Sequence, residues 1–223
     1  MRLQSLLSIY AVPIVVLSVA ACSEAGGDTQ ATTGGSSTGG VGIGGTASGG
    51  AGAAGANGCT PHELLTNGNF DAGGSGWTES SGKWPAVIVT AAMTTGNVMP
   101  QSGSHLARFG GYPDAAQDNL ISTVNVPTSA TNIVFSYYSI VTSQETSAER
   151  RDSLFLSLDS DIQYVEQVLD NTTVHAAWQR YQMPIDPQAA GKTLVLLMRA
   201  ENDGMNATTF LIDSMSLIAT ACP

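Results

Sequence analysis

Short runs of β-branched and aromatic residues recur along the C-terminal part of the chain, separated by Gly, Pro, Asn, Asp and Ser. This spacing is typical of strands joined by turns, and it leaves no room for helices between them. The pattern therefore predicts an all-β, antiparallel sandwich or barrel. The predicted strands are Trp84–Thr90, His105–Gly110, Leu120–Val126, Asn132–Thr142, Ser153–Leu158, Gln163–Leu169, Trp178–Pro184, Thr193–Ala200 and Thr209–Leu217.

Alternation within these runs predicts their buried faces. In Ser153–Leu158, leucines occupy every second position, so that Phe155 and Ser157 fall on the opposite face. The run Thr193–Met198 is apolar on both faces, which favours a central strand. Gln144–Arg151 is polar throughout and is expected to be a loop, not a helix.

The first 21 residues have the three parts of a secretory signal peptide. Arg2 supplies the positive charge, an apolar run follows over Leu6–Leu17, and small residues end the segment. Ser8 and Pro13 interrupt this run, which is too short for a good permanent transmembrane helix. We therefore expect an exported protein from which residues 1–21 are removed.

The segment Val19–Cys22 (VAAC) resembles the lipobox of bacterial lipoproteins. The resemblance implies that Cys22 becomes the lipidated first residue of the mature protein, anchored to the membrane by several acyl chains. Ser23 after the cysteine implies the outer membrane in a cell that has one. The alternative is an ordinary signal peptide with a chance cysteine.

Residues 22–57 follow as a linker, in which Ser23–Asn57 is dominated by Gly, Ala, Ser and Thr and has no aromatic residue. Such a segment buries too little apolar surface to offset the entropy of ordering it, so we expect a disordered spacer. Its root-mean-square reach would be roughly 30 Å. An adhesive or glycosylated stalk is the alternative. One folded domain, residues 58–223, remains.

Cysteine count adds a constraint on that domain. With Cys22 assigned to lipid, Cys59 and Cys222 remain, one at each end of the domain. An even pair in an exported protein predicts a disulfide, which requires adjacent termini. Free thiols or a metal pair are the alternative, although no CxxC motif supports the metal.

Composition and motifs exclude several functions. With 18 Asp plus Glu against 8 Lys plus Arg, the formal net charge is −10, which disfavours nucleic acid. The folded domain contains no GxSxG elbow, and His62, His105 and His175 form no ligand spacing. No pattern indicates an organic cofactor. A glycosidase needs only two carboxylates at a defined separation, so a hydrolase stays open as the least favoured function.

Several segments together resemble a known family. Leu64–Asp71 (LLTNGNFD) with Gly76-Trp77, and Thr209–Leu217 (TFLIDSMSL), are similar to the first and last parts of galactose-binding-like jelly rolls, which include carbohydrate-binding modules. The segments similar to MAM-like variants of that sandwich are Gly103–Gly111, Leu120–Pro127, and Glu145 with Asp152–Leu158. The resemblance spans residues 59–217 and implies a jelly-roll β-sandwich with adjacent termini.

The same resemblance implies a structural Ca²⁺ held by Asp71 and Asp213. Asp213 is predicted to share a face with Leu211 and Met215, where an uncompensated charge would be costly. The alternative is that Asp213 caps backbone amides near Asn67–Asp71.

A second acidic group lies on one loop. Glu145 and Asp152 flank Arg150 and Arg151, and we expect a local ion-pair cluster here rather than a second site.

Aromatic side chains are the candidate sugar-stacking residues. The resemblance assigns Trp77 and Trp178 to packing, which leaves Trp84, Tyr112 and Tyr138 as ligand-binding candidates, with Tyr138 facing outward if Tyr137 faces inward.

The sequence therefore favours a non-catalytic, surface-anchored lipoprotein that binds carbohydrate or another extracellular polymer. The alternative is a structural or protein-interaction lipoprotein of the envelope without a small ligand.

Overall fold

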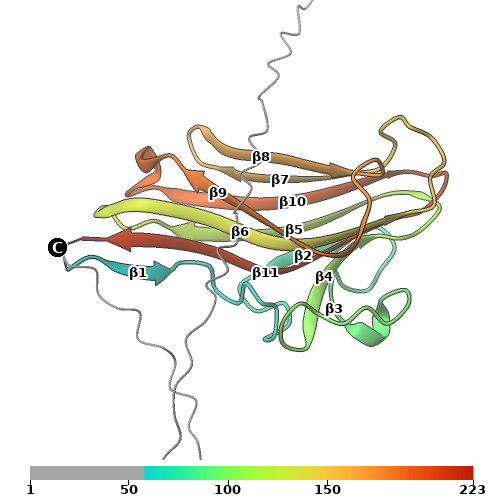
Figure 1. Cartoon of the computed structure of the whole chain (residues 1–223), viewed down its shortest axis with the longest axis horizontal. Coiled ribbons are helices and arrows are strands. Elements are labelled where there is room, and N and C mark those ends of the chain that lie inside the picture. Colours follow the sequence, from blue (N-terminus) through green and yellow to red (C-terminus); the bar gives the residue numbers. More distant parts are fainter. Residues whose placement is uncertain (1–57, 223) are drawn as a thin grey trace, which may run out of the picture. The chain divides into compact units, whose positions relative to one another are not determined.

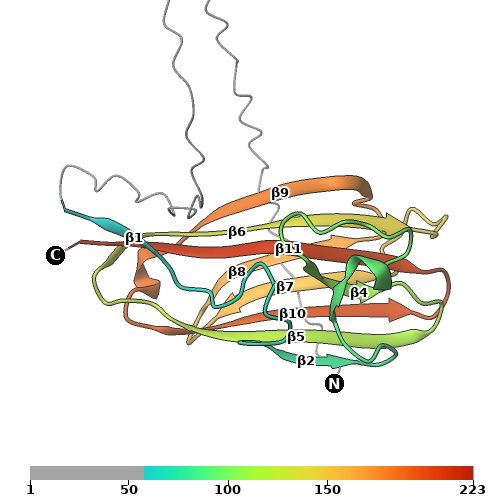
Figure 2. The same cartoon turned by 90° about the horizontal axis from the view of Figure 1, so that it is seen from below.

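In the computed structural model, which describes residues 58–222, the chain folds into two antiparallel β-sheets layered face to face (Figures 1 and 2). The arrangement is the jelly-roll β-sandwich that the sequence predicts. The signal peptide (1–21), the lipidation site Cys22 and the linker (22–57) lie outside the described residues.

The six-stranded sheet has the order β3-β4-β11-β6-β9, and β1 pairs with the C-terminal part of β11. Its strands are β1 (Thr60–Glu63), β3 (Ile88–Thr90), β4 (His105–Gly110), β6 (Ala130–Ser143), β9 (His175–Ile185) and β11 (Thr208–Ala221).

The five-stranded sheet has the order β2-β5-β10-β7-β8. Its strands are β2 (Thr78–Ser81), β5 (Ala115–Asn125), β7 (Ser153–Asp159), β8 (Gln163–Asp170) and β10 (Thr193–Asp203). The central position of β10 confirms the expectation from its apolar sequence. Two short 3-10 helices, Ala91–Met93 and Pro187–Ala189, complete the described elements.

The core lies between the sheets and is built from alternate residues of their strands. Tyr137 and Phe210 reach it from the six-stranded sheet, and Leu156 and Leu196 reach it from the other. Tyr137 is fully buried, so Tyr138 points to the outer face of its sheet, as predicted.

Each of the nine predicted runs contains a strand, whereas β1 and β2 are missed. Their sequences, TPHE and TESS, carry no apolar pattern and are mostly exposed. The strand predicted from Trp84 begins only at Ile88. Pro85 lacks an amide hydrogen, and the Glu79 carboxylate accepts from the amides of Val87 and Ile88 at 2.8 and 2.9 Å.

A β-bulge in β11 makes the prediction that Leu211, Asp213 and Met215 share one face of the strand wrong. The register with β6 shifts between Asp213 and Ser216, where Ser214 has a φ of 49°. Leu211 therefore packs on the outer face of the sheet, whereas Met215 points into the core. Asp213, two residues after Leu211, shares its face. A single alternation cannot describe a strand that contains an extra residue.

Gly68 fixes this bulge from the preceding loop. Its carbonyl accepts from the Met215 amide at 2.9 Å. A Cβ at position 68 would lie 2.0 Å from the Met215 carbonyl oxygen, so only glycine allows the two backbones to approach this closely.

Residues 91–104, which we call the covering segment, lie against the outer face of the six-stranded sheet (Figure 2). Val98 of this segment packs on a second small cluster of buried side chains. The cluster comprises Val89, Leu106, Ile140 and Leu211. Trp178, expected in the core, is instead half-buried against this cluster and donates its Nε1 hydrogen to the Met99 carbonyl at 3.1 Å. Its position on β9 places it on the outer face.

Cys59 and Cys222 form a disulfide with a Cα–Cα distance of 4.1 Å, as the cysteine count predicts. The bond lies beside the pairing of Thr60 with Ala221, where β1 meets the end of β11 (Figure 1). In the chain-entropy model, closing a loop of this length stabilises the fold by up to about 5 kcal/mol.

Candidate functional site

Two of the three predicted sugar-stacking residues, Trp84 and Tyr112, lie together, but they are packed rather than free. Their ring centroids are 5.8 Å apart. The Trp84 indole donates to the Gly110 carbonyl at 2.8 Å, and the Arg108 guanidinium lies 3.9 Å from the Trp84 ring centroid. Tyr112 is 5% exposed. The Tyr112 ring is therefore enclosed and has no free face for stacking, and one face of Trp84 is already occupied.

Buried charge explains why these rings are enclosed. Arg108 and Asp118 are both buried, and Asp118 accepts from the Gly110 amide at 2.7 Å and from the Ser81 hydroxyl at 2.5 Å. Burial lowers the pKa of Arg108, and the charge of Asp118 partly opposes that effect. Burial and Asp118 both raise the pKa of Tyr112. The aromatic rings shield this charged group from water, which is a structural role.

Tyr138 stands apart from that group, half-buried on the outer face of β6. Its register partners are Arg180 on β9 and Asp213 on β11. It therefore lies beside the carboxylate predicted to bind a metal.

The predicted metal ligands Asp71 and Asp213 both bind the same short segment, Ser102–Ser104. Asp71 accepts from the Ser104 amide at 2.6 Å, and Asp213 accepts from the Ser102 amide at 3.1 Å. Asp213 also accepts from the Ser214 amide at 2.5 Å. Asp213 does cap backbone amides, but these belong to the covering segment and to its own bulge, not to residues 67–71.

The electrostatics of this pair favour a cation. Asp213 is fully buried, and burial raises its pKa to about 6, with a further increase from the charge of Asp71. The amide of Ser104 lowers the pKa of the exposed Asp71. Gly103, with a φ of 63°, lets the backbone approach, since a Cβ there would lie 2.0 Å from an Asp71 oxygen. Two carboxylates thus converge on backbone that only glycine permits, and their oxygens are the groups here that could bind a cation.

An open hollow of about 280 Å³ lies on the outer face of the five-stranded sheet, where the sequence analysis placed no site. Strands β7, β8 and β10 supply its lining. The lining residues are Phe155, Leu156, Ser157, Gln163, Glu166, Leu197 and Arg199. Phe155 is half-buried, so part of its ring is accessible.

Charged side chains surround that ring. The guanidinium carbons of Arg199 and Arg150 lie 5.3 and 5.9 Å from the Phe155 centroid. Arg199 also pairs with Glu201 at 3.1 Å. The hollow therefore contains a half-buried aromatic ring, beside which two guanidinium groups lie, with hydrogen-bond donors and acceptors around it. Its signal was present in the sequence, because Phe155 falls on the polar face of an alternating strand.

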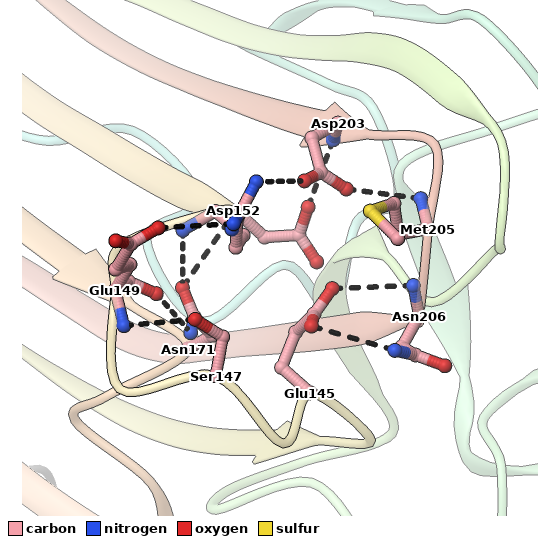
Figure 3. A network of polar contacts seen from close by, with 9 residues as sticks. Glu145, Ser147, Glu149, Asp152, Asn171, Asp203, Met205 and Asn206 are labelled. Atoms are coloured by element: carbon pink, nitrogen blue, oxygen red, sulfur yellow. Dashed lines mark hydrogen bonds and ion pairs between the residues drawn. The ribbon is translucent and has the colours of Figure 1, made fainter.

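The expected ion-pair cluster at the loop 144–152 is wrong in its partners (Figure 3). Arg151 pairs with Glu149 at 2.9 Å and lies 4.0 Å from Asp203. Glu145 instead accepts from the backbone and side-chain amides of Asn206 at 3.2 and 3.4 Å. Asp152 is fully buried.

Residues 58–222 show neither a preformed cluster of three His, Cys, Asp or Glu side chains that could hold a metal nor a helix long and apolar enough to span a membrane.

Comparison with known proteins defines the fold and not a family. No family model matches the chain, and no curated protein matches it. Among solved structures, the module TmCBM61 in complex with β-1,4-galactotriose has a TM-score of 0.50 and 17% identity, over 70% of this chain and 97% of that one. This likeness supports the jelly-roll architecture.

Two further structures are less similar. A family 16 carbohydrate-binding module has a TM-score of 0.45 and 18% identity, over 69% of this chain and 98% of that one. The enzymatically active domain of tailspike protein 4 from bacteriophage CBA120 has a TM-score of 0.44 and 15% identity, over 70% of this chain and 21% of that one.

Proposed function

We propose that this protein is a non-catalytic carbohydrate-binding module, and that the sugar binds in the hollow around Phe155. The supporting observation is the accessible part of an aromatic ring within a polar depression on an otherwise regular sheet face. Aromatic rings bind the apolar faces of pyranoses, and nearby polar groups orient the hydroxyls.

The polar lining suits a ligand rich in hydroxyl groups. Arg199 can donate hydrogen bonds, Glu166 can accept them, and Gln163 can do both. Because the hollow is open and shallow, it is better suited to a segment of a polymer than to an enclosed small molecule. The first structure in the comparison contains a bound galactotriose, so β-1,4-galactan is the first ligand to test.

We further propose that the module is exported and held at the outer membrane by lipid on Cys22, with residues 22–57 as the spacer. The support is the sequence alone, because these residues lie outside the described structure. A surface module on a spacer would capture polymer near the cell.

A structural Ca²⁺ between Asp71 and Asp213 belongs to the same proposal. The two carboxylates would hold the ion, and the ion would neutralise Asp213 and fasten the covering segment to the bulge of β11. Chelation of calcium should then lower the melting temperature, and Asp71→Asn should reduce the size of that effect.

The sugar proposal is tested by affinity electrophoresis of the full-length protein in β-1,4-galactan, followed by a glycan array. Phe155→Ala should weaken binding at least tenfold, because the stacking ring is lost. Val195→Ala is the matched control, since Val195 is 41% exposed on β10 outside the hollow, and should change affinity less than twofold.

Absence of binding to any glycan, or unchanged binding by Phe155→Ala, would favour the alternative of an envelope protein that contacts other proteins. Release of reducing ends from a bound glycan would favour a hydrolase.

A further inference from the structure

The loop between β6 and β7 meets the turn between β10 and β11 at the end of the sandwich away from the disulfide, and three carboxylates gather there. Glu145 comes from the loop, Asp152 precedes β7, and Asp203 ends β10 (Figure 3). Glu145 accepts hydrogen bonds from the backbone and side-chain amides of Asn206, and Asp152 accepts one from the Asp203 amide at 2.9 Å. The group is separate from the pair Asp71 and Asp213, since it lies at the start of β11, whereas Asp213 lies in the middle of that strand.

One oxygen of this group lacks a hydrogen bond of normal geometry. Asp152 is fully buried, and its Oδ2 receives no hydrogen bond of normal geometry. The neighbouring Thr208 hydroxyl pairs with Ser143 at 2.8 Å. Figure 3 shows the Asp152 carboxylate lying between Asp203 and Glu145. A buried carboxylate oxygen without a donor is costly unless a cation or a proton compensates it.

The two arginines of the loop balance the charge of this region only in part. Arg151 pairs with Glu149 at 2.9 Å and lies 4.0 Å from Asp203, whereas the Arg150 guanidinium lies over Phe155. Burial raises the pKa of Asp152, the Asp203 amide and the Thr208 hydroxyl lower it, and the charges of Asp203 and Glu145 raise it again. Two negative neighbours around a buried carboxylate make this region attractive to a cation.

We propose that Glu145, Asp152 and Asp203 bind a Ca²⁺ ion that joins the β6–β7 loop to the β10–β11 turn. Ca²⁺ accepts six to eight oxygen ligands in flexible geometry, so carboxylates on loops, together with water, suit it. The three side chains do not already form a closed metal cluster in residues 58–222. Binding therefore draws the half-buried Glu145 and the exposed Asp203 toward the buried Asp152.

Calorimetric titration of calcium into the chelator-treated, full-length protein tests the site. The titration uses Asp71→Asn as the parent, so that binding at the other carboxylate pair does not obscure the result. We expect saturable binding in this parent. Adding Glu145→Gln or Asp203→Asn should weaken it at least tenfold, because each removes one charged ligand.

Glu149→Gln is the matched control, because Glu149 lies on the same loop but pairs with Arg151. It should leave calcium affinity within twofold. The melting temperature of the parent should rise by about 5–10 °C at calcium a hundredfold above its Kd. This rise should be lost in Glu145→Gln.

Two results would overturn the proposal. One is no calcium binding by the Asp71→Asn parent, which would mean that Asp152 is neutralised by a proton. The other is parental affinity in both Glu145→Gln and Asp203→Asn, provided that each melts as the parent does in chelator. Neither result depends on whether the hollow around Phe155 binds sugar.

Discussion

The outer faces of the two sheets differ in what lies on them. The six-stranded sheet is covered by residues 91–104, and buries Arg108 and Asp213 beneath or beside that segment. The outer face of the five-stranded sheet instead carries the open hollow around Phe155. The outer face of the six-stranded sheet is therefore packed against another part of the fold, whereas the outer face of the five-stranded sheet leaves apolar and polar side chains accessible. A search for ligands should therefore concentrate on the five-stranded sheet.

The largest expected difference in stability is between two Leu→Ala substitutions, one on the outer face of each sheet. Leu211→Ala removes a side chain that is 3% exposed in the cluster beneath the covering segment, and should lower the free energy of unfolding by about 3 kcal/mol. Leu197→Ala, on the half-buried edge of the hollow, should cost less than about 1 kcal/mol. Urea denaturation measures both. Equal losses would show that the two faces are equally enclosed.

The pH dependence of stability tests the enclosure of Asp213 on the six-stranded sheet. Its folded-state pKa of about 6 lies above the usual 3.8, so the unfolded chain loses its proton first as pH rises. Without metal, stability should fall between about pH 4 and pH 6 and then level off, by up to about 3 kcal/mol.

Asp213→Asn should remove most of that slope, and saturating calcium should flatten it as well. The control Asp161→Asn alters an exposed carboxylate on the other sheet that pairs with Lys192, and should keep the fall. The measurement is urea denaturation at a series of pH values in chelator. A stability that rises between pH 4 and pH 6 in the parent would contradict the assignment.

The smallest stability effects are expected for two aromatic residues, the packed Trp84 and the partly accessible Phe155, which should differ in their effect on glycan binding. Trp84→Ala should cost about 2 kcal/mol, because it removes the ring against Arg108 and the hydrogen bond to Gly110, yet leave glycan affinity unchanged. Phe155→Ala should cost about 1 kcal/mol or less and reduce glycan affinity instead. Melting curves and affinity electrophoresis of both variants test this. Loss of binding by Trp84→Ala alone would move the site to the six-stranded sheet.

Much of the fold was accessible to sequence reasoning, because hydrophobic alternation and turn residues are local signals. They locate strands such as His105–Gly110, whose bounds the structure reproduces. The bulge at Ser214 was not accessible, since it depends on the contact of Met215 with Gly68, far away in the chain. The polar strands β1 and β2 form only because β11 and β5 offer them partners.

The site was harder to predict than the fold. Tyr112 lies in a loop whose sequence is typical of the surface. In the fold its side chain is buried beside Arg108 and Asp118, and this contact between distant segments cannot be seen in the local sequence. Conversely, the sequence already places Phe155 on the polar face of its strand. An isolated aromatic residue on a polar face was the one sign in the sequence that this face could bind a ligand. Which strands flank that residue, and hence that a hollow forms, follows only from the strand order.

The bond between Cys59 and Cys222 also determines how the domain carries mechanical load. β1 is a four-residue strand, and a pull applied at residue 58 without the bond would peel it from β11 one pair at a time. With the bond, tension passes covalently into the end of β11, which is paired with β6 along its length. The pull is then resisted along fourteen residues of paired strand loaded together. A domain built this way would keep its fold under tension applied at residue 58.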